Sequence, residues 1–286
     1  MAVLADFKAE KPTWCPGCGD FGVLNALQRA AVGLGLDPED MVVVSGIGCS
    51  GKLSAYFGSY GLHTIHGRSL PTAQGVKLAN RELTVLAAGG DGDGFGIGMG
   101  HFIHAMRRNV DITYLVMDNH IYGLTTGQTS PTSDTGMVTK TAPRGAIEQP
   151  VHPVSLALVT GCGFVAQGFS GDIGQLADII GRAIAHKGFS FVNIFSPCVT
   201  YNKQNTYEYY KSGVVRLADV PGHDSANRAA ALALAGDSEH IYTGVFYEGP
   251  GVSFEDGAPK FSKTGLATQR HELAAQDYDQ LLAQFR

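Results

Sequence analysis

The hydrophobic and polar positions form short apolar runs separated by longer helical patterns, which is typical of a parallel β-sheet covered by helices. Runs such as Val42–Val44 have no polar face, as expected of strands that are buried on both sides. Five such runs predict strands at Met41–Ser45, Leu83–Ala88, Ile112–Met117, Phe164–Gln167 and Phe189–Phe195.

The segments between these strands have helical periodicity. They predict helices at Phe21–Val32, Thr72–Asn80, Gly96–Arg108, Pro153–Thr160 and Ile173–His186. Right-handed β-α-β crossovers would join the elements into a doubly wound, mostly parallel α/β sheet. We therefore predict one α/β domain over residues 1–211 and a C-terminal extension over residues 212–286.

The pattern weakens after residue 211. It predicts a short helix at Ala226–Ala235, a strand at His240–Phe246 and an amphipathic helix at Glu272–Phe285. We expect this extension to pack on the domain or on a partner subunit. The earlier stretch Tyr122–Pro150 is rich in Thr, Ser, Gly and Pro, and its length favours a functional loop over a simple connection.

Composition excludes several classes of protein. Lys and Arg number 21 against 26 Asp and Glu, and this net charge of −5 argues against a nucleic-acid or anionic-membrane partner. No apolar run approaches the ~20 residues that a membrane span needs, and residues 1–11 lack an apolar signal segment. We expect a cytoplasmic protein. Its 38 glycines among 286 residues form no low-complexity tract, so they must serve particular turns.

Residues of metal-ligand type follow four of the predicted strands. Cys49, Asp91, Asn119 and Cys198 each lie within about four residues of a strand's end. Ligands of open α/β sheets bind outside the carboxyl ends of the strands. We therefore expect these four side chains to converge.

Four of the five cysteines could form one site. The Cys15-x-x-Cys18 spacing lets two thiolates face one metal or cluster, and Cys49 and Cys198 would complete the set. The absence of a matching histidine pattern favours a [4Fe–4S] cluster, while zinc, a redox pair and unrelated thiols stay as alternatives. Cys162, beside a predicted strand, is expected in the core.

A glycine-rich turn, residues 89–94, follows a predicted strand and opens a helix. Such a turn presents backbone N–H groups to phosphate. Its acids, Asp91 and Asp93, would repel a bare pyrophosphate, but they suit Mg²⁺ held between protein and phosphate. Asn119 lies at the end of the next strand and could be a second ligand. The alternatives are an ordinary tight turn and an Asx-turn or helix cap.

Together these motifs resemble the thiamine-diphosphate fold, whose signature is Gly-Asp-Gly followed 25–30 residues later by Asn. The longer sequence segments around these motifs are similar to those of the β subunit of 2-oxoacid:ferredoxin oxidoreductases, the family of the 2-oxoglutarate and pyruvate enzymes. The resemblance covers about residues 10–211. The matching segments are Trp14–Asp20, Gly46–Cys49, His66–Arg68, Gly90–Asp93, Asp118–Gln128 and Ser196–Asn202.

The resemblance implies the diphosphate-binding half of a thiamine-diphosphate fold and three cofactors. One [4Fe–4S] cluster would be ligated by Cys15, Cys18, Cys49 and Cys198. Mg²⁺ would be held by the side chains of Asp91 and Asn119 and by the carbonyl of Ile121. The residues lining thiamine diphosphate would be Ile47, Gly48, Cys49, Ser50, His66, Gly67, Gly90, Asp91, Gly92, Asp93, Asn119, Tyr122, Gly123, Leu124 and Thr125.

No residue of this chain is assigned as catalytic, because the thiamine ring carries the chemistry in this family. His66, Lys52 and Arg68 are candidates for contacts to the diphosphate or to a substrate carboxylate, with packing or surface roles as alternatives. His101 and His104 favour packing on a helix face over metal binding. A tyrosine cluster is expected at a contact between subunits; its members are Tyr207, Tyr209 and Tyr210.

The implied activity is the oxidative decarboxylation of a 2-oxoacid with coenzyme A, with electrons passed through the cluster to ferredoxin, and its reversal as reductive carboxylation. We expect 2-oxoglutarate as substrate, with pyruvate or a broad range as the alternative. Thr126 stands where some relatives carry Lys, which leaves carboxylate recognition on this chain open. Other classes are another thiamine-enzyme half-chain, an iron–sulfur electron-transfer subunit, and a nucleotide-binding protein with incidental thiols.

A partner is implied as well. Thiamine enzymes need a second domain beside the aminopyrimidine, and residues 212–286 are too few for it. The resemblance therefore implies an α subunit that carries the pyrimidine-facing and coenzyme-A-facing domains, in an (αβ)₂ assembly.

Overall fold

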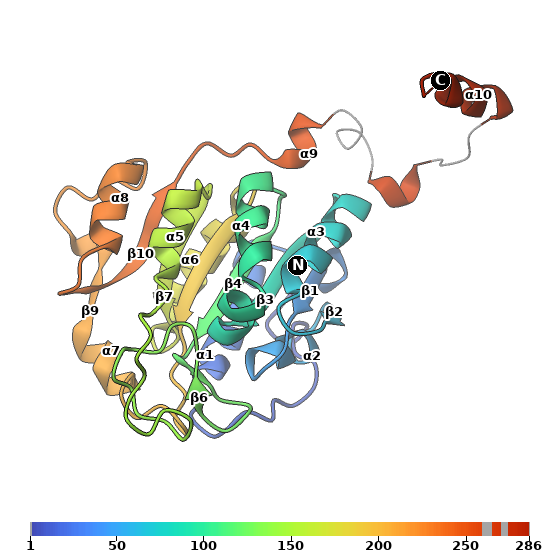
Figure 1. The fold of residues 1–286 in the computed structure, drawn as a ribbon. Coiled ribbons are helices and arrows are strands. Elements are labelled where there is room, and N and C mark those ends of the chain that lie inside the picture. The colour runs from blue at the N-terminus through green and yellow to red at the C-terminus, as the bar shows by residue number, and fades with distance from the viewer. Residues whose placement is uncertain (1, 259–264, 270–273, 286) are drawn as a thin grey trace.

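The computed structural model describes residues 2–258, 265–269 and 274–285, and an eight-stranded sheet forms their centre (Figure 1). The spatial order is β2-β1-β3-β4-β8-β7-β10-β9. From β2 to β7 all pairings are parallel, whereas β10 pairs antiparallel with β7. The strands are β1 Met41–Ser45, β2 Tyr60–His63, β3 Thr84–Gly90, β4 Thr113–Asp118, β7 Phe164–Phe169, β8 Ser190–Phe195, β9 Val214–Arg216 and β10 Ile241–Glu248.

The five predicted strands of the domain are confirmed as β1, β3, β4, β7 and β8, each within two residues of its predicted bounds. Every residue of β1, β4 and β8 is buried, which explains why their apolar runs are continuous. The edge strand β2 was not predicted. All four of its residues are exposed, so no hydrophobic pattern indicates it.

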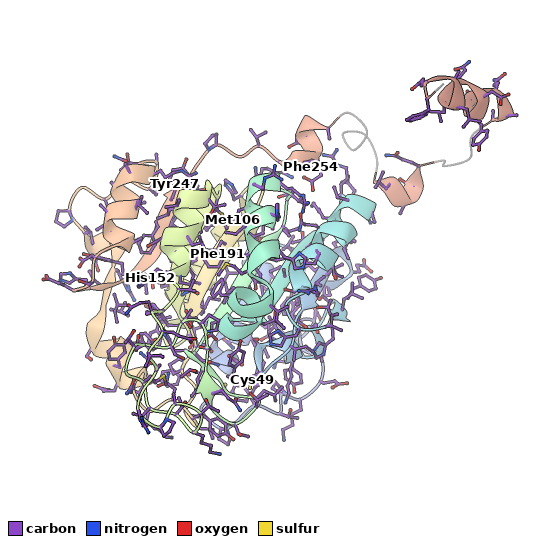
Figure 2. All side chains as sticks on the ribbon, in the orientation of Figure 1. Cys49, Met106, His152, Phe191, Tyr247 and Phe254 are labelled. Carbon is purple, nitrogen blue, oxygen red and sulfur yellow. The ribbon has the colours of Figure 1, made fainter. Side chains whose placement is uncertain are left out.

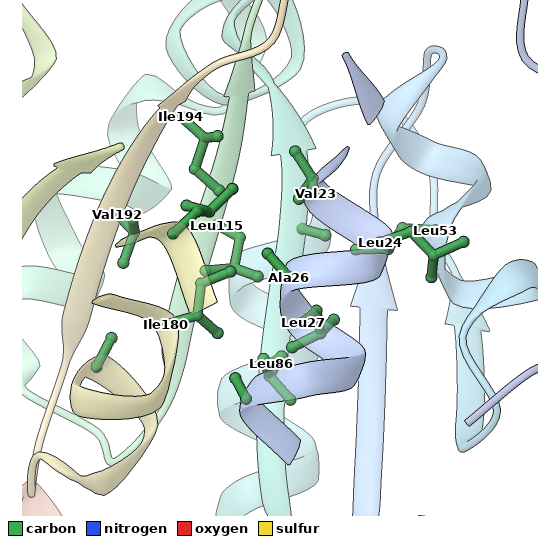
Figure 3. Packing of buried hydrophobic residues seen from close by; sticks show 14 of the residues in the cluster. Val23, Leu24, Ala26, Leu27, Leu53, Leu86, Leu115, Ile180, Val192 and Ile194 are labelled. Carbon is green, nitrogen blue, oxygen red and sulfur yellow. The ribbon is translucent and has the colours of Figure 1, made fainter. Parts of the chain in front are cut away.

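Helices cover both faces of the sheet, which confirms the doubly wound architecture. Helices α1 and α6 pack on one face, and α3, α4 and α5 pack on the other. Figure 3 shows α1 side chains, among them Val23 and Leu27, against Leu86 and Leu115 of the strands. The helices are α1 Asp20–Gly33, α2 Leu53–Tyr56, α3 Ser69–Ala79, α4 Met99–Arg108, α5 Pro153–Thr160, α6 Ile173–Ala185, α7 Tyr207–Gly213, α8 Arg228–Ala235, α9 Phe254–Gly257 and α10 Ala275–Ala283.

Two helices of the predicted α/β domain begin three residues away from their predicted first residues. Helix α3 begins three residues early, at Ser69, and α4 begins three residues late, at Met99. Before α4, residues Asp93–Ile97 form a π-helical turn in which Gly98 N donates to Asp93 O at 3.1 Å. Such turns are rare and are frequent at functional sites.

The C-terminal segment adds to the same sheet. Strand β10, helix α8 and helix α10 match the predicted elements, although residues 272–273 of the last prediction lie outside the described residues. Helix α10 lies apart from the sheet (Figure 1). The division of domains at residue 211 stays a prediction. None of the described helices has the length and apolar character needed to cross a membrane.

The loop after β4 holds the small hairpin of β5, Ile121–Tyr122, and β6, Gln128–Thr129. The chain then runs irregularly from residue 130 to 152. Figure 2 shows Cys49 at the end of the molecule where this loop gathers, and Phe254 at the opposite end.

Candidate functional site

Strand order places the predicted ligands along one edge of the sheet. Strands β1, β3, β4 and β8 are consecutive neighbours and parallel. Asp91 and Asn119 follow β3 and β4 directly, and Cys49 and Cys198 come shortly after β1 and β8. The expected convergence at the carboxyl ends is therefore present in the fold.

A cavity of about 70 Å³ opens at this edge. Every residue predicted to contact thiamine diphosphate lines it except Gly67, and Ile121 lines it too. Gly67 lies just behind the cavity, where its N–H donates to Asp93 Oδ1 at 2.8 Å. The lining residues are Ile47, Gly48, Cys49, Ser50, His66, Gly90, Asp91, Gly92, Asp93, Asn119, Ile121, Tyr122, Gly123, Leu124 and Thr125.

Asp93 holds three segments of the cavity wall together. Besides Gly67, it accepts a hydrogen bond from Ile47 N at 2.8 Å, and His66 Nδ1 lies 3.7 Å from its Oδ1. A Cβ at Gly46 would overlap the Asp93 carboxylate, so only glycine allows this approach. Burial raises the pKa of Asp93 above its ordinary value, and the two backbone donors partly oppose the rise.

Asp91 is a buried acid, 2% exposed. The Thr132 hydroxyl lies 2.8 Å from Asp91 Oδ2 and 2.8 Å from Asp118 Oδ1, so it can donate to either carboxylate. Burial, and after it the charge of Asp118, raises the pKa of Asp91 to about 6. Among the described residues, no lysine or arginine forms an ion pair with Asp91 or Asp118.

These oxygens fit a hard divalent cation. Mg²⁺ takes one or two carboxylates together with substrate phosphates, waters and neutral oxygens, and the residues Asp91, Asn119 and Ile121 line one cavity. Within residues 2–258, 265–269 and 274–285, no three His, Cys, Asp or Glu side chains surround a single point. A cation here would therefore depend on amide, carbonyl and phosphate oxygens beside the one carboxylate.

Two of the cysteines, Cys49 and Cys198, meet beside the same cavity. A Cβ at Gly123 would lie 3.4 Å from Cys198 Sγ and 3.9 Å from Cys49 Sγ, so both sulfurs face this glycine. Trp14 Nε1 donates to Cys49 O at 2.8 Å, which ties the turn after β1 to the chain just before Cys15.

Gly19 lets the Cys15–Cys18 loop approach the strand end that carries Cys198. Its N–H donates to Pro197 O at 3.1 Å. A Cβ at this position would lie 2.5 Å from Ser196 Oγ and 2.7 Å from Pro197 N, closer than atoms pack. The glycine after the second cysteine is therefore a steric requirement for bringing the two cysteine segments together.

The thiols are placed where ionisation is unfavourable. Burial raises the pKa of Cys18 far above its ordinary value, and Asp20, Cys49 and Cys198 add to the rise. Burial, followed by Asp20 and Cys198, raises the pKa of Cys49 to about 11. Thiolates at these buried positions would need a positively charged metal centre to stabilise them. Cysteine sulfurs are the usual ligands of iron–sulfur clusters, and the sulfurs of Cys49 and Cys198, which share Gly123 as a neighbour, are of the type that would hold one.

Other predicted residues lie elsewhere. Lys52 Nζ donates to Thr13 Oγ1 at 3.2 Å, and Arg68 Nη1 donates to Gly67 O at 3.3 Å. Neither Lys52 nor Arg68 lines the cavity. Cys162 is fully buried with its thiol 3.2 Å from Phe164 O, as expected of a core residue.

The prediction of a tyrosine cluster at a subunit contact is wrong for Tyr210 and stays a prediction for Tyr207 and Tyr209. Tyr210 is 1% exposed and stacks on Phe195 with ring centroids 4.6 Å apart. It is a core residue and is not available for a contact between subunits, because α7 packs it against the end of β8. Tyr209 remains exposed.

Sequence reasoning missed a buried polar network behind Asp91. His120 has a left-handed backbone, φ 58°, and its Nδ1 lies 2.6 Å from Thr132 O. Burial opposes a charge on His120, but Asp118 and Asp91 outweigh it and raise the pKa of the imidazole. Asn193 Nδ2 donates to Asp118 Oδ2 at 3.2 Å. Only the motif Asp118–Asn119 hinted at this group, since Thr132 and Asn193 lie far away in sequence.

Comparisons with known proteins agree with this geometry. Residues 41–194 match the family "Thiamine pyrophosphate enzyme, C-terminal TPP binding domain", and residues 198–263 match the C-terminal family of the pyruvate ferredoxin oxidoreductase beta subunit. The chain is 49% identical over 223 residues to 2-oxoacid:ferredoxin oxidoreductase subunit beta of Saccharolobus solfataricus, covering 77% of this chain and 73% of that one.

Two further similarities span nearly the whole chain. One is to 2-oxoacid:ferredoxin oxidoreductase 2, subunit beta, of Aeropyrum pernix, 40% identical over 93% of this chain and 91% of the relative. The other is to the solved structure of 2-oxoglutarate:ferredoxin oxidoreductase from Magnetococcus marinus with 2-oxoglutarate, coenzyme A and succinyl-CoA bound. The identity is 40%, the TM-score is 0.91, and the match covers 100% of this chain and 96% of that one.

Proposed function

This chain belongs to the family of 2-oxoacid:ferredoxin oxidoreductase β subunits, and from this membership we propose how its site works. Asp91, Asn119 and the carbonyl of Ile121 hold Mg²⁺ against the diphosphate of thiamine diphosphate. Cys15, Cys18, Cys49 and Cys198 hold one [4Fe–4S] cluster. The partner is an α subunit in an (αβ)₂ assembly, ferredoxin accepts the electrons, and the reducing cytoplasm suits the thiols.

One observation carries this proposal: Cys49 belongs to both groups. It lines the cavity of the proposed thiamine site, and its sulfur shares Gly123 as a neighbour with the sulfur of Cys198. A thiamine enzyme without electron transfer has no need of cysteines there. An electron-transfer protein without thiamine has no need of the buried Asp91 on the next strand.

The chain's own residues position and protect the site. When bound, thiamine diphosphate supplies an electron sink for decarboxylation and the cluster supplies one-electron transfer. Asp93, in the turn after β3, holds the turns after β1 and β2 in place by accepting hydrogen bonds from Ile47 N and Gly67 N. Tyr122 packs over Gly92 and donates to its carbonyl at 3.2 Å, which closes the glycine-rich turn at the cavity.

We propose 2-oxoglutarate as the substrate, converted with coenzyme A to succinyl-CoA and CO₂. The support is the neighbour solved with 2-oxoglutarate, coenzyme A and succinyl-CoA. Pyruvate is the second candidate, because residues 198–263 match a pyruvate ferredoxin oxidoreductase family. His66, at the cavity, is the candidate for a phosphate contact. The positions of Lys52 and Arg68 leave them as candidates for contacts outside the cavity.

The test is anaerobic purification of the αβ complex, followed by iron, sulfide and thiamine analysis. We expect about four irons per αβ unit from this chain's site, one thiamine diphosphate, and faster ferredoxin reduction with 2-oxoglutarate than with pyruvate. Cys198→Ser should remove this iron, while Cys162→Ala, a change at a buried cysteine outside the site, should keep it. Thiamine without iron in the wild type would overturn the ferredoxin-linked mechanism.

A further inference from the structure

Asn202 is a buried amide in the segment that follows β8, four residues after Cys198. It is 1% exposed, and its side chain makes four hydrogen bonds. Its Oδ1 accepts from Gln204 N at 2.9 Å and from Asn205 N at 3.0 Å. Its Nδ2 donates to Asn205 Oδ1 at 2.8 Å and to Asn119 O at 3.0 Å. These bonds use both donors and both acceptor sites of the amide, so the network fixes the orientation of this side chain.

The bond to Asn119 joins two segments that have already left the sheet. The ladder between β4 and β8 ends where Ser196 N donates to Asp118 O at 2.8 Å. Beyond it, Asn202 donates to Asn119, which lies 83 residues away in sequence. The backbone N–H of Asn202 donates to Cys198 O at 3.1 Å and keeps this residue beside the cysteine. The side chain therefore ties the turn after β4 to the turn after β8.

The same bond holds the peptide group between Asn119 and His120. The N–H of this peptide donates to Asp118 Oδ1 at 3.3 Å, and its carbonyl accepts from Asn202 Nδ2. His120 has a left-handed backbone, φ 58°, a conformation that persists where surrounding contacts hold it. The turn then reaches Ile121, whose N–H donates to Asn119 Oδ1 at 3.1 Å. Asn119 and Ile121 are the residues that would give neutral oxygens to Mg²⁺.

The local turn at Asn202 does not require an amide. An oxygen acceptor is enough for the N–H groups of Gln204 and Asn205, and a Ser or Thr hydroxyl can supply one in such turns. The donor to Asn119 O, by contrast, requires the amide nitrogen. Groups that hydrogen-bond to metal-binding residues orient them. Resting on the proposed function, we propose that Asn202 is a positioning residue that holds the Asn119–Ile121 turn, and with it the Mg²⁺ end of the thiamine site, against the segment carrying Cys198.

The experiment is calorimetric titration of the anaerobic αβ complex, freed of thiamine diphosphate, with thiamine diphosphate at several Mg²⁺ concentrations. Asn202→Ser keeps an acceptor for the local turn and removes the donor to Asn119. It should bind thiamine diphosphate about tenfold more weakly at limiting Mg²⁺, and excess Mg²⁺ should restore binding. Iron per αβ unit should stay at the wild-type value, because the bond to Cys198 O comes from the backbone of Asn202.

The matched control is Asn205→Ala. Asn205 is also buried, 5% exposed, and its loss removes the other bond of Asn202 Nδ2 while the donor to Asn119 remains. This variant should need no more Mg²⁺ than the wild type. Equal weakening in Asn205→Ala and Asn202→Ser would assign the effect to the buried network as a whole and overturn the role of the bond to Asn119.

The remaining outcomes separate this inference from the proposed function. A wild-type complex that binds no thiamine diphosphate would overturn the proposed function itself. Iron-loaded Asn202→Ser with wild-type dependence on Mg²⁺ would overturn only the role of Asn202. If Asn202→Ser fails to assemble, Asn202→Thr replaces it in the titration. Loss of iron and thiamine diphosphate together from both variants would show that Asn202 only stabilises the fold, and would equally overturn the proposal.

Discussion

The acids at the two edges of the central sheet differ in burial and in their partners. At the amino edge, Asp111 lies 3.3 Å from Lys77 Nζ and 3.3 Å from Lys187 Nζ, so the chain supplies its counter-charges. At the carboxyl edge, Asp20 and Asp91 are each 2% exposed or less, and no lysine or arginine in the described ranges pairs with either. Buried acids without basic partners cluster at functional sites, so the difference agrees with the cofactor site proposed at the carboxyl edge.

The largest effect is expected from a substitution that pushes apart the two cysteine segments at the carboxyl edge of the sheet. Gly19→Ala places a Cβ 2.5 Å from Ser196 Oγ and should reduce bound iron by about tenfold or more, an effect expected of groups that orient ligands. Gly100→Ala is the control, because a Cβ there meets no described atom within 4 Å. Iron analysis of both complexes is the measurement. Full iron in Gly19→Ala would contradict the steric argument.

Replacing one acid at each edge should lower the free energy of unfolding at the amino edge only. Asp111→Asn leaves the buried ammonium of Lys77 without its counter-charge and should lower the free energy of unfolding by about 2–3 kcal/mol. Asp91→Asn should not lower it in the cofactor-free protein at pH 8, because it removes a buried unpaired charge. Urea denaturation of the cofactor-free protein measures both. Equal losses would show that the two acids play the same structural part.

The unpaired edge should also respond to pH. The pKa of Asp91 is raised to about 6, so protons compete with Mg²⁺ below that pH. Affinity for Mg²⁺ should be constant above it and fall by about tenfold for each pH unit below it. In the cofactor-free protein, the pH dependence of stability has the opposite sign. The folded state binds the Asp91 proton more tightly than the unfolded state, so protonation stabilises the fold at low pH. This contribution to the free energy of unfolding is lost as pH rises from about 4 through 6. Calorimetric titration with Mg²⁺ between pH 5 and 8 checks the first statement, and a flat profile would refute it.

The smallest expected effects come from removing one threonine hydroxyl at each edge of the sheet. Thr132→Val removes the hydroxyl shared by Asp91 and Asp118 and should weaken Mg²⁺ binding by about tenfold. Thr113→Val, at the start of β4, removes a bond to Ala183 O and should cost about 1 kcal/mol of stability with unchanged Mg²⁺ affinity. The same titration and denaturation experiments measure both variants. Equal Mg²⁺ affinities would remove Thr132 from the site.

The amino-acid sequence alone was enough to predict the five central strands, the covering helices and the ligand types at the strand ends. Strands buried on both faces must be continuously apolar, so their pattern is visible without neighbours. Asp91, Asn119, Cys49 and Cys198 could be assigned to one edge for the same reason, because each follows a strand whose end could be recognised.

The contacts that join distant segments arise only in the folded chain. The exposed edge strand β2, the antiparallel pairing of β10 with β7, and the pairs Asp20–Ser196 and Asp91–Thr132 have no local pattern. Asp20 and Ser196 are 176 residues apart, and their hydrogen bond exists because α1 and the end of β8 meet where Gly19 leaves room. Strand order and close packing set such contacts, and neither is encoded in the periodicity of any single segment.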